Sequence, residues 1–165
     1  MKRLSSRLIL ALAATVLFAA AVHAATAKKP TLQVTTLDGT QFDLAAQRGK
    51  WVIVNFWATW CSPCIKEMPD ISRFVTGRSD VRAIGLAYGD EEPADIREFL
   101  VKHPVQYPIA AVPTDNKLPD FGRPKALPTT YLIAPDGSVA KKFTGPITAE
   151  ELDKTIAAGT KANKS

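Results

Sequence analysis

Residues 51–64 of this 165-residue chain read WVIVNFWATWCSPC. The first seven residues form an apolar run of β-branched and aromatic side chains, interrupted only by Asn55, which predicts a buried central strand. The last four form a Cys-x-x-Cys motif, and its Cys61 and Cys64 are the only cysteines of the sequence. Because Pro63 is tolerated in the first turn of a helix, we expect a helix to begin at the motif.

Two cysteines alone narrow the chemistry that the motif can support. A structural zinc site needs further ligands, and the only histidines are His23 and His103. A small disulfide-stapled scaffold would have more bridges and a shorter chain. The pair therefore indicates reversible thiol–disulfide exchange. An inert bridge or two buried thiols are the alternatives, although a bridge across so short a loop would constrain little of the fold.

Residues 1–24 have the pattern of a signal peptide. Three basic residues precede an uncharged Ala/Leu-rich run over 8–22, which at about 15 residues is shorter than the ~20 that span a bilayer. We expect cleavage after Ala24, or after Ala27 as a variant, and export to the periplasm. An uncleaved membrane anchor is the alternative, whereas a lipoprotein anchor is excluded because this segment contains no cysteine.

The charge and length that remain suit a single globular domain. Three of the 21 basic residues and none of the 16 acidic ones lie in the segment 1–24, so the rest of the chain carries a net charge of +2. This small excess does not indicate nucleic-acid binding. We expect a short linker at 25–30, a monomeric domain over 31–158 and a disordered tail at 159–165.

Strand and helix patterns alternate along that domain. Predicted strands cover 32–34, 41–44, 81–88, 107–112, 129–134 and 138–143, and a second predicted helix covers 93–103. Thr148 and Glu151 form a capping box that opens a last helix, and Pro69 is expected to kink the first one. Alternation that ends in a hairpin favours an α/β fold, with a mixed sheet and helices on both faces.

Three pieces of the chain resemble the exported TlpA/ResA-like thiol–disulfide oxidoreductases of the thioredoxin fold. The first is NFWATWCSPCIKEMP at 55–69, and the second is ALPTTYLI at 126–133, followed by Pro-Asp-Gly at 135–137. The third is the segment 93–125, which is longer than plain thioredoxin allows. The resemblance spans 31–158. It implies a central mixed sheet flanked by helices, with an N-terminal β-hairpin and a βα-type insertion before a cis-proline.

The two cysteines are predicted to have different roles. The N–H groups and dipole at the start of a helix stabilise a thiolate, so we assign Cys61 as the exposed nucleophile. Cys64 lies one turn further along and is expected to be the more buried, resolving thiol. Of the two neighbouring tryptophans, Trp57 is predicted to lie in the core and Trp60 on the active-site surface.

Glu67 is the third predicted catalytic residue. It follows Cys64 by three positions, so both lie on one face of the predicted helix. In thioredoxin a buried aspartate of the central strand helps to move the proton of the second cysteine, but the matching residue here is Asn55, which does not titrate. The resemblance assigns that role to Glu67, with a pKa raised by burial. A solvated carboxylate that only suits the helix dipole is the alternative.

The predicted substrate-binding residues are Trp60, Ser62, Pro63, Leu127 and Pro128. The resemblance implies a cis bond between Leu127 and Pro128, with the proline beside the disulfide and the backbone of Leu127 pairing with an extended substrate. An ordinary proline that opens the strand at 129 is the alternative. Ser62 and Pro63 are expected to tune the redox potential through the start of the helix.

These features predict an exported enzyme that reduces disulfides of periplasmic partner proteins and takes electrons from a membrane thiol reductase. The family's targets include thiols of apocytochrome c and copper-site cysteines. No cofactor, metal or nucleic-acid partner is expected. The alternatives are a disulfide donor, a copper-binding thiol carrier, which the sequence disfavours for want of a Met/His cluster, and a peroxiredoxin-type peroxidase, whose Pro-x-x-x-Thr-x-x-Cys string is missing before Cys61.

Overall fold

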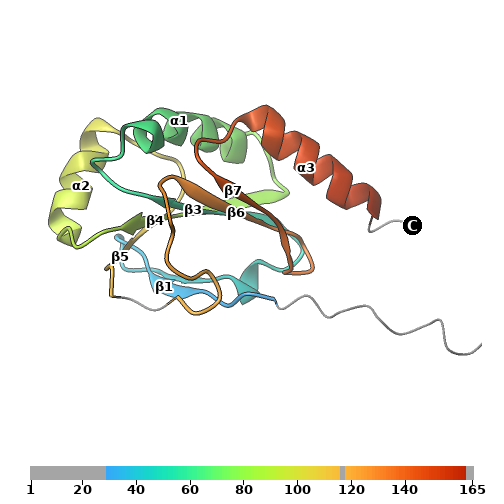
Figure 1. Ribbon diagram of the computed structural model, residues 1–165, viewed down its shortest axis with the longest axis horizontal. Helices are drawn as coiled ribbons and strands as arrows, with labels where there is room; N and C mark the ends of the chain where they lie inside the picture. Colours follow the sequence, from blue (N-terminus) through green and yellow to red (C-terminus); the bar gives the residue numbers. More distant parts are fainter. Residues whose placement is uncertain (1–28, 116–117, 163–165) are drawn as a thin grey trace, which may run out of the picture.

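The computed structural model describes residues 29–115 and 118–162 (Figure 1). Its elements follow one another as β1 (Gln33–Thr35), β2 (Gln41–Asp43), the 3-10 helix η1 (Ala45–Gln47), β3 (Trp51–Trp57), α1 (Ser62–Thr76), β4 (Val81–Tyr88), α2 (Pro93–Lys102), β5 (Ile109–Val112), β6 (Thr129–Ile133), β7 (Val139–Thr144) and α3 (Ala149–Ala162). The expected signal segment lies outside these residues.

A five-stranded mixed sheet, in the order β5-β4-β3-β6-β7, forms the centre of the fold. β3 pairs with β4 in parallel and with β6 in antiparallel orientation. At the two edges, β5 pairs in parallel with β4, and β7 pairs antiparallel with β6. All seven residues of β3 are buried, which agrees with the unbroken apolar run of the sequence. The predicted thioredoxin-like α/β fold is therefore confirmed.

The two faces of the sheet are covered by different structures. One face carries Ile53 and Trp57 of β3 and packs against buried residues of α1, α2 and α3. The other face carries Val54 and Phe56 and packs against the β1–β2 hairpin and Phe121. Figure 1 shows the hairpin below the sheet and α1 and α3 above it.

This arrangement corrects the expectation of helices on both faces. The buried apolar residues of α1, α2 and α3 belong to one cluster, because the N-terminal hairpin already covers the opposite face with Leu32, Phe42 and Leu44. The segment predicted as an insertion contains α2 and β5. Within the described ranges, no helix is both long and apolar enough to cross a membrane.

The predicted tail from residue 159 is also corrected, because α3 continues to Ala162. The last turns of this helix pack on the core at Gly159. A Cβ atom at this position would lie 2.6 Å from Cη2 of Trp51, so the glycine lets the helix backbone lie directly on the indole. α1 likewise runs without interruption past Pro69, and a kink at this proline stays a prediction.

Candidate active site

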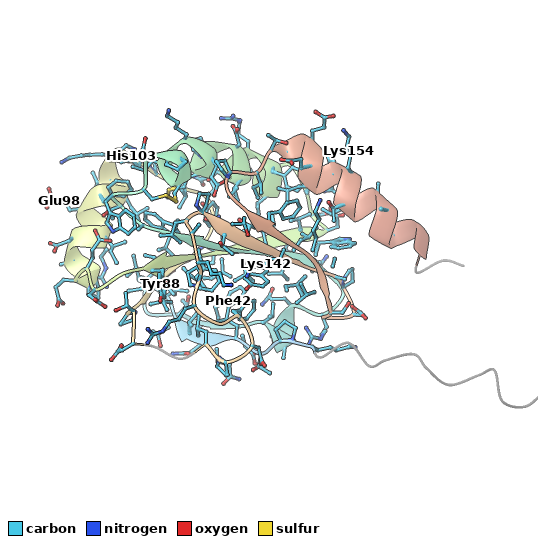
Figure 2. The ribbon with its side chains drawn as sticks, viewed as in Figure 1. Phe42, Tyr88, Glu98, His103, Lys142 and Lys154 are labelled. Atoms are coloured by element: carbon cyan, nitrogen blue, oxygen red, sulfur yellow. A yellow bond between two sulfur atoms is a disulfide. The ribbon has the colours of Figure 1, made fainter. Side chains whose placement is uncertain are left out.

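The cysteine pair lies where β3 gives way to α1. Cys61 is the N-cap of α1, and Pro63 occupies its first turn, where the missing N–H is not needed. Cys61 and Cys64 form a disulfide with an S–S distance of 2.03 Å, drawn as the yellow bond at the start of α1 in Figure 2. The Cys61 carbonyl accepts from the Ile65 N–H at 3.1 Å, so the helical hydrogen bonds begin at the motif itself.

The exposure of the two cysteines follows the predicted order but not the predicted degree. Cys64 is 0% exposed, which agrees with a buried resolving thiol. Cys61 was expected to be exposed, whereas only 4% of it is accessible. The oxidised pair packs into the same apolar cluster as Trp57 and Met68, which explains the difference. Solvent therefore reaches the disulfide from the Cys61 side.

Glu67 is buried, with 3% of its surface exposed. Its Oε1 accepts a hydrogen bond from Asn55 Nδ2 at 2.8 Å, and its Oε2 accepts one from the Ile147 N–H at 2.9 Å. The same Asn55 nitrogen donates to Thr130 Oγ1 at 2.9 Å. These contacts contradict the alternative of a solvated carboxylate, because both oxygens face the interior.

Burial raises the pKa of Glu67 from its ordinary 4.5 to about 7, against the hydrogen bonds from the Ile147 N–H and from Asn55, which lower it. An apolar environment penalises the charged carboxylate, and the two donors offset only part of that penalty. Glu67 can therefore exchange a proton near neutral pH. Since it lies one turn after Cys64 on α1, this acid–base group lies on the same helix face as the predicted resolving thiol.

The peptide bond between Leu127 and Pro128 is cis, as the resemblance implied. Pro128 is buried, and its carbonyl accepts from the Gly145 N–H at 2.9 Å. Leu127 is partly buried and packs against the clusters on both faces of the sheet. Contact of these two residues with a substrate stays a prediction.

The other predicted substrate-binding residues are exposed next to Cys61. Trp60 is 71% exposed, and Ser62 and Pro63 are exposed in the first turn of α1. Trp57 is fully buried, as predicted. The accessible surface at the motif therefore consists of an indole and an uncharged dipeptide.

Three groups that contact the buried Glu67 carboxylate, or its partner Asn55, were not predicted from the sequence. Asn55 was noted only as a residue that does not titrate, although a polar side chain inside an apolar strand is a signal for a buried hydrogen bond. Thr130 and the Ile147 N–H had no such signal. Nor did the sequence reveal that Thr59 donates to Glu91, which joins the loop before the motif to the loop after β4.

Among the described residues, no group of three or more His, Cys, Asp or Glu side chains is placed to hold a metal ion. The chemistry at this site comes from the cysteine pair and from Glu67. A redox-active pair at the start of a helix, on a sheet of this topology, defines a thioredoxin-like thiol–disulfide oxidoreductase.

Comparison with known proteins agrees with this class. The family model described as Redoxin matches residues 23–158. Thiol-disulfide oxidoreductase ResA of Bacillus cereus is 34% identical over 126 residues, which cover 75% of this chain and 72% of that protein. A thiol:disulfide interchange protein of the thioredoxin family from Chlorobium tepidum TLS superposes with a TM-score of 0.69 at 26% identity, covering 83% of this chain and 98% of that one.

StoA from Bacillus subtilis shares the fold, with a TM-score of 0.64 at 24% identity over 78% of this chain and 98% of its own. The chain belongs to the Redoxin family, among the TlpA/ResA-like thiol–disulfide oxidoreductases.

Proposed function

We propose that this protein is exported to the periplasm and there reduces disulfides of other exported proteins. The observation that carries the thiol–disulfide chemistry of this proposal is the buried Glu67, which follows Cys64 by one turn and has a pKa raised to about 7. A resolving thiol that is itself buried needs a base of this kind, because bulk water does not reach its proton.

The reaction begins with the reduced pair. The Cys61 thiolate attacks one sulfur of a substrate disulfide, and the other substrate sulfur leaves as a thiolate and takes up a proton. The Glu67 carboxylate takes the proton of Cys64, whose thiolate then attacks the Cys61 sulfur. The second substrate thiolate leaves and is protonated, and the enzyme keeps the Cys61–Cys64 disulfide. Two electrons have passed to the substrate, and Glu67 returns its proton to the leaving thiolate or to solvent.

The dipeptide between the cysteines supports a reducing role. Strong oxidants of this fold stabilise the nucleophilic thiolate, and a neighbouring cation is one group that can do so. Ser62 and Pro63 carry no charge, so this dipeptide adds no cation to the stabilisation that the helix N-terminus gives the Cys61 thiolate. We infer a potential nearer the roughly −270 mV of thioredoxin than the roughly −120 mV of a strong oxidant.

The place of action and the electron source follow from the predicted signal peptide. A cysteine pair outside the cytosol becomes oxidised unless something reduces it, and the periplasm has no glutathione buffer. A membrane thiol reductase would therefore regenerate the dithiol. Trp60, Ser62 and Pro63 would contact the partner, with the backbone of Leu127 pairing with its extended segment.

The reduction potential of the Cys61–Cys64 pair tests the direction of electron flow. The protein is equilibrated in thiol–disulfide buffers, and the dithiol fraction is measured after acid quenching and alkylation. A value near that of thioredoxin supports the reductase. A value near that of the strong oxidants would make this protein a disulfide donor instead.

Substitution of each cysteine tests the assigned roles. Cys64→Ser is expected to accumulate a mixed disulfide through Cys61 with a model disulfide protein, because the resolving thiol is gone. Cys61→Ser is expected to abolish turnover and to trap nothing. Mass spectrometry of the trapped species identifies the linked cysteine, and a bond through Cys64 would reverse the assignment.

A further inference from the structure

The side-chain amide of Asn55 is hydrogen-bonded at one end only. Its Nδ2 atom donates to Glu67 Oε1 at 2.8 Å and to Thr130 Oγ1 at 2.9 Å, so both of its N–H groups are used. Its Oδ1 atom is buried and has no hydrogen-bond partner within the described ranges. Most buried polar atoms have such a partner. Glu67 and Thr130 therefore decide which end of this amide faces them.

Both partners of the amide can reverse the direction of their hydrogen bond. The Thr130 hydroxyl can donate as well as accept, and Glu67 Oε1 accepts in the carboxylate but donates once it is protonated. The other carboxyl oxygen, Oε2, faces the Ile147 N–H at 2.9 Å, and a backbone N–H cannot accept a proton. The proton of neutral Glu67 therefore belongs on Oε1, which faces Asn55.

Protonation of Oε1 would place its O–H donor against the Nδ2 donor of Asn55. A half-turn of the carboxamide removes this conflict, because Oδ1 then occupies the position of Nδ2 and can accept from the hydroxyl groups of both Glu67 and Thr130. This terminal torsion is roughly two-fold, so both orientations are accessible to it. The turn also breaks no bond at the other end of the amide, since Oδ1 has none.

Few other groups near Glu67 can titrate. The apolar cluster on this face of the sheet contains Cys61 and Cys64, here joined in the disulfide, and Tyr107. Burial and the charge of Glu67 raise the pKa of Tyr107, so its hydroxyl stays protonated. Within the described ranges Glu67 makes no ion pair, and the groups that bond to it are the neutral amide of Asn55 and the Ile147 N–H.

We propose that Asn55 is a positioning residue of the thiol–disulfide reaction, whose carboxamide reverses with the charge of Glu67: Nδ2 donates to the carboxylate, and Oδ1 accepts from the carboxylic acid. The proposal rests on the proposed role of Glu67 as the base for Cys64. It accounts for an amide oxygen that is buried without a partner, since a bond at that end would hold the amide in one orientation.

The reversal accompanies one proton transfer. The S–H bond of Cys64 breaks, an O–H bond forms on Glu67, and Cys64 is left as a thiolate. The half-turn of Asn55 then gives the new O–H group an acceptor. Glu67 thus keeps its hydrogen bond to Asn55 in both protonation states, and the amide turns back when the proton leaves.

NMR of the oxidised wild-type protein tests the reversal without any substitution. The carboxyl carbon of Glu67 and the side-chain amide of Asn55 are followed from about two pH units below to about two above the Glu67 pKa of about 7. Above the midpoint, NOEs are expected between the Nδ2 protons and the side chain of Thr130. Below it these NOEs should be lost, because the N–H groups have turned away.

The amide of Gln41 is the internal control, because it donates to the Thr35 hydroxyl at 2.7 Å without a carboxyl partner at the same nitrogen. Its NOEs should not change near pH 7. NOEs of Asn55 that persist through the titration of Glu67 would overturn the proposal, since the same end of the amide would then face Glu67 in both states.

Asn55→Leu tests the consequence for the reaction. Leucine has the branched shape of asparagine but neither donor nor acceptor, so the carboxylate loses a hydrogen bond. The midpoint of the pH–rate profile of the resolution step is expected to move upward by at least about half a pH unit. It is measured by stopped-flow release of the second thiol from a preformed mixed disulfide at Cys61.

Tyr131→Phe is the matched control for this variant. Tyr131 is also buried, but it lies on the opposite face of the sheet and donates to the Phe121 carbonyl at 2.7 Å. Its removal should leave the midpoint in place. An unchanged midpoint in Asn55→Leu, or an equal shift in both variants, would contradict the role of Asn55.

Glu67→Gln separates this inference from the proposed function. If Glu67 is the base, this variant loses the limb of the pH–rate profile near pH 7, and a limb that persists would contradict the proposed function itself. A limb that disappears in Glu67→Gln, together with wild-type NOEs of Asn55 that do not change with pH, would contradict only the reversal of the amide.

Discussion

At the scale of single residues, Glu67 has the largest consequences for both stability and chemistry. A carboxyl group in an apolar interior favours its protonated form, and two donors are not enough to restore an ordinary pKa. A raised pKa in the folded state means that folding takes up a proton over the interval between the two pKa values. The same group therefore links the free energy of unfolding to pH.

Glu67→Gln is expected to make the free energy of unfolding depend less on pH. Between pH 4.5, the ordinary pKa, and about 7, the folded-state pKa, the native protein binds more protons than the unfolded chain, so its stability falls as pH rises. The contribution of Glu67 is fully present below pH 4.5 and is lost by pH 7, a change of up to about 3 kcal/mol. Urea unfolding at half-unit pH steps measures it.

The quantity to compare is the slope of the free energy of unfolding against pH, and not its value at one pH. Glutamine cannot accept from both Asn55 and the Ile147 N–H, so the variant is expected to be less stable at every pH. Subtracting its curve from that of the wild type removes the contribution of the aspartates, whose lowered pKa values act at more acidic pH. Parallel curves between pH 4.5 and 7 would show that Glu67 keeps an ordinary pKa.

At the scale of elements, the start of α3 shows how a local pattern becomes structure. Glu151 Oε2 accepts from the Thr148 N–H at 3.0 Å, and Thr148 Oγ1 accepts from the Glu151 N–H at 3.2 Å. This is the capping box that the sequence predicted. Leu152 and Ile156, which follow it, are buried against the sheet, so the cap sets where the apolar face of the helix begins.

Thr148→Ala is expected to lower the free energy of unfolding by about 1 kcal/mol, because an N–H group at the start of α3 loses its acceptor. Thr155→Ala is the matched control. Its hydroxyl donates to the Glu151 carbonyl in the middle of the same helix, and its removal should change the stability by less than about 0.5 kcal/mol. Equal losses in urea unfolding would argue against the cap.

At the scale of the whole molecule, the β1–β2 hairpin is attached to the sheet and to α2 at its turn. The Leu37 N–H donates to the Ile109 carbonyl at 2.7 Å, and the Leu37 carbonyl accepts from Arg97 Nη2 at 2.8 Å and Nε at 3.1 Å. One residue of the hairpin thus joins β5 and α2. These contacts hold the hairpin in the position where its apolar residues cover the second face of the sheet.

Arg97→Ala is expected to loosen this attachment, lowering the free energy of unfolding by about 1 kcal/mol and accelerating amide exchange of Leu37. Arg82→Ala is the control, because Arg82 donates only to the nearby Ser79 and Val81 carbonyls. Hydrogen exchange followed by NMR measures both variants. Unchanged protection of the Leu37 amide in Arg97→Ala would mean that the hairpin is held by apolar contacts alone.

The sequence alone determined the features that depend on neighbours along the chain. The apolar run of β3, the start of α1 at the cysteine motif and the capping box of α3 are local patterns, and each element forms where its pattern indicated. The cysteine pair and Glu67 were predicted from their spacing and from the family resemblance, since three positions on a helix define one face.

Only the tertiary structure decided the environment of these residues. Glu67 has a raised pKa because the folded chain buries it, although Asn55 of β3 and the Ile147 N–H, 80 positions away, donate to it and lower that pKa. The hairpin, rather than a helix, covers the second face of the sheet. Burial and pKa depend on groups brought together from distant parts of the chain, and such groups leave no periodic or local pattern in the sequence.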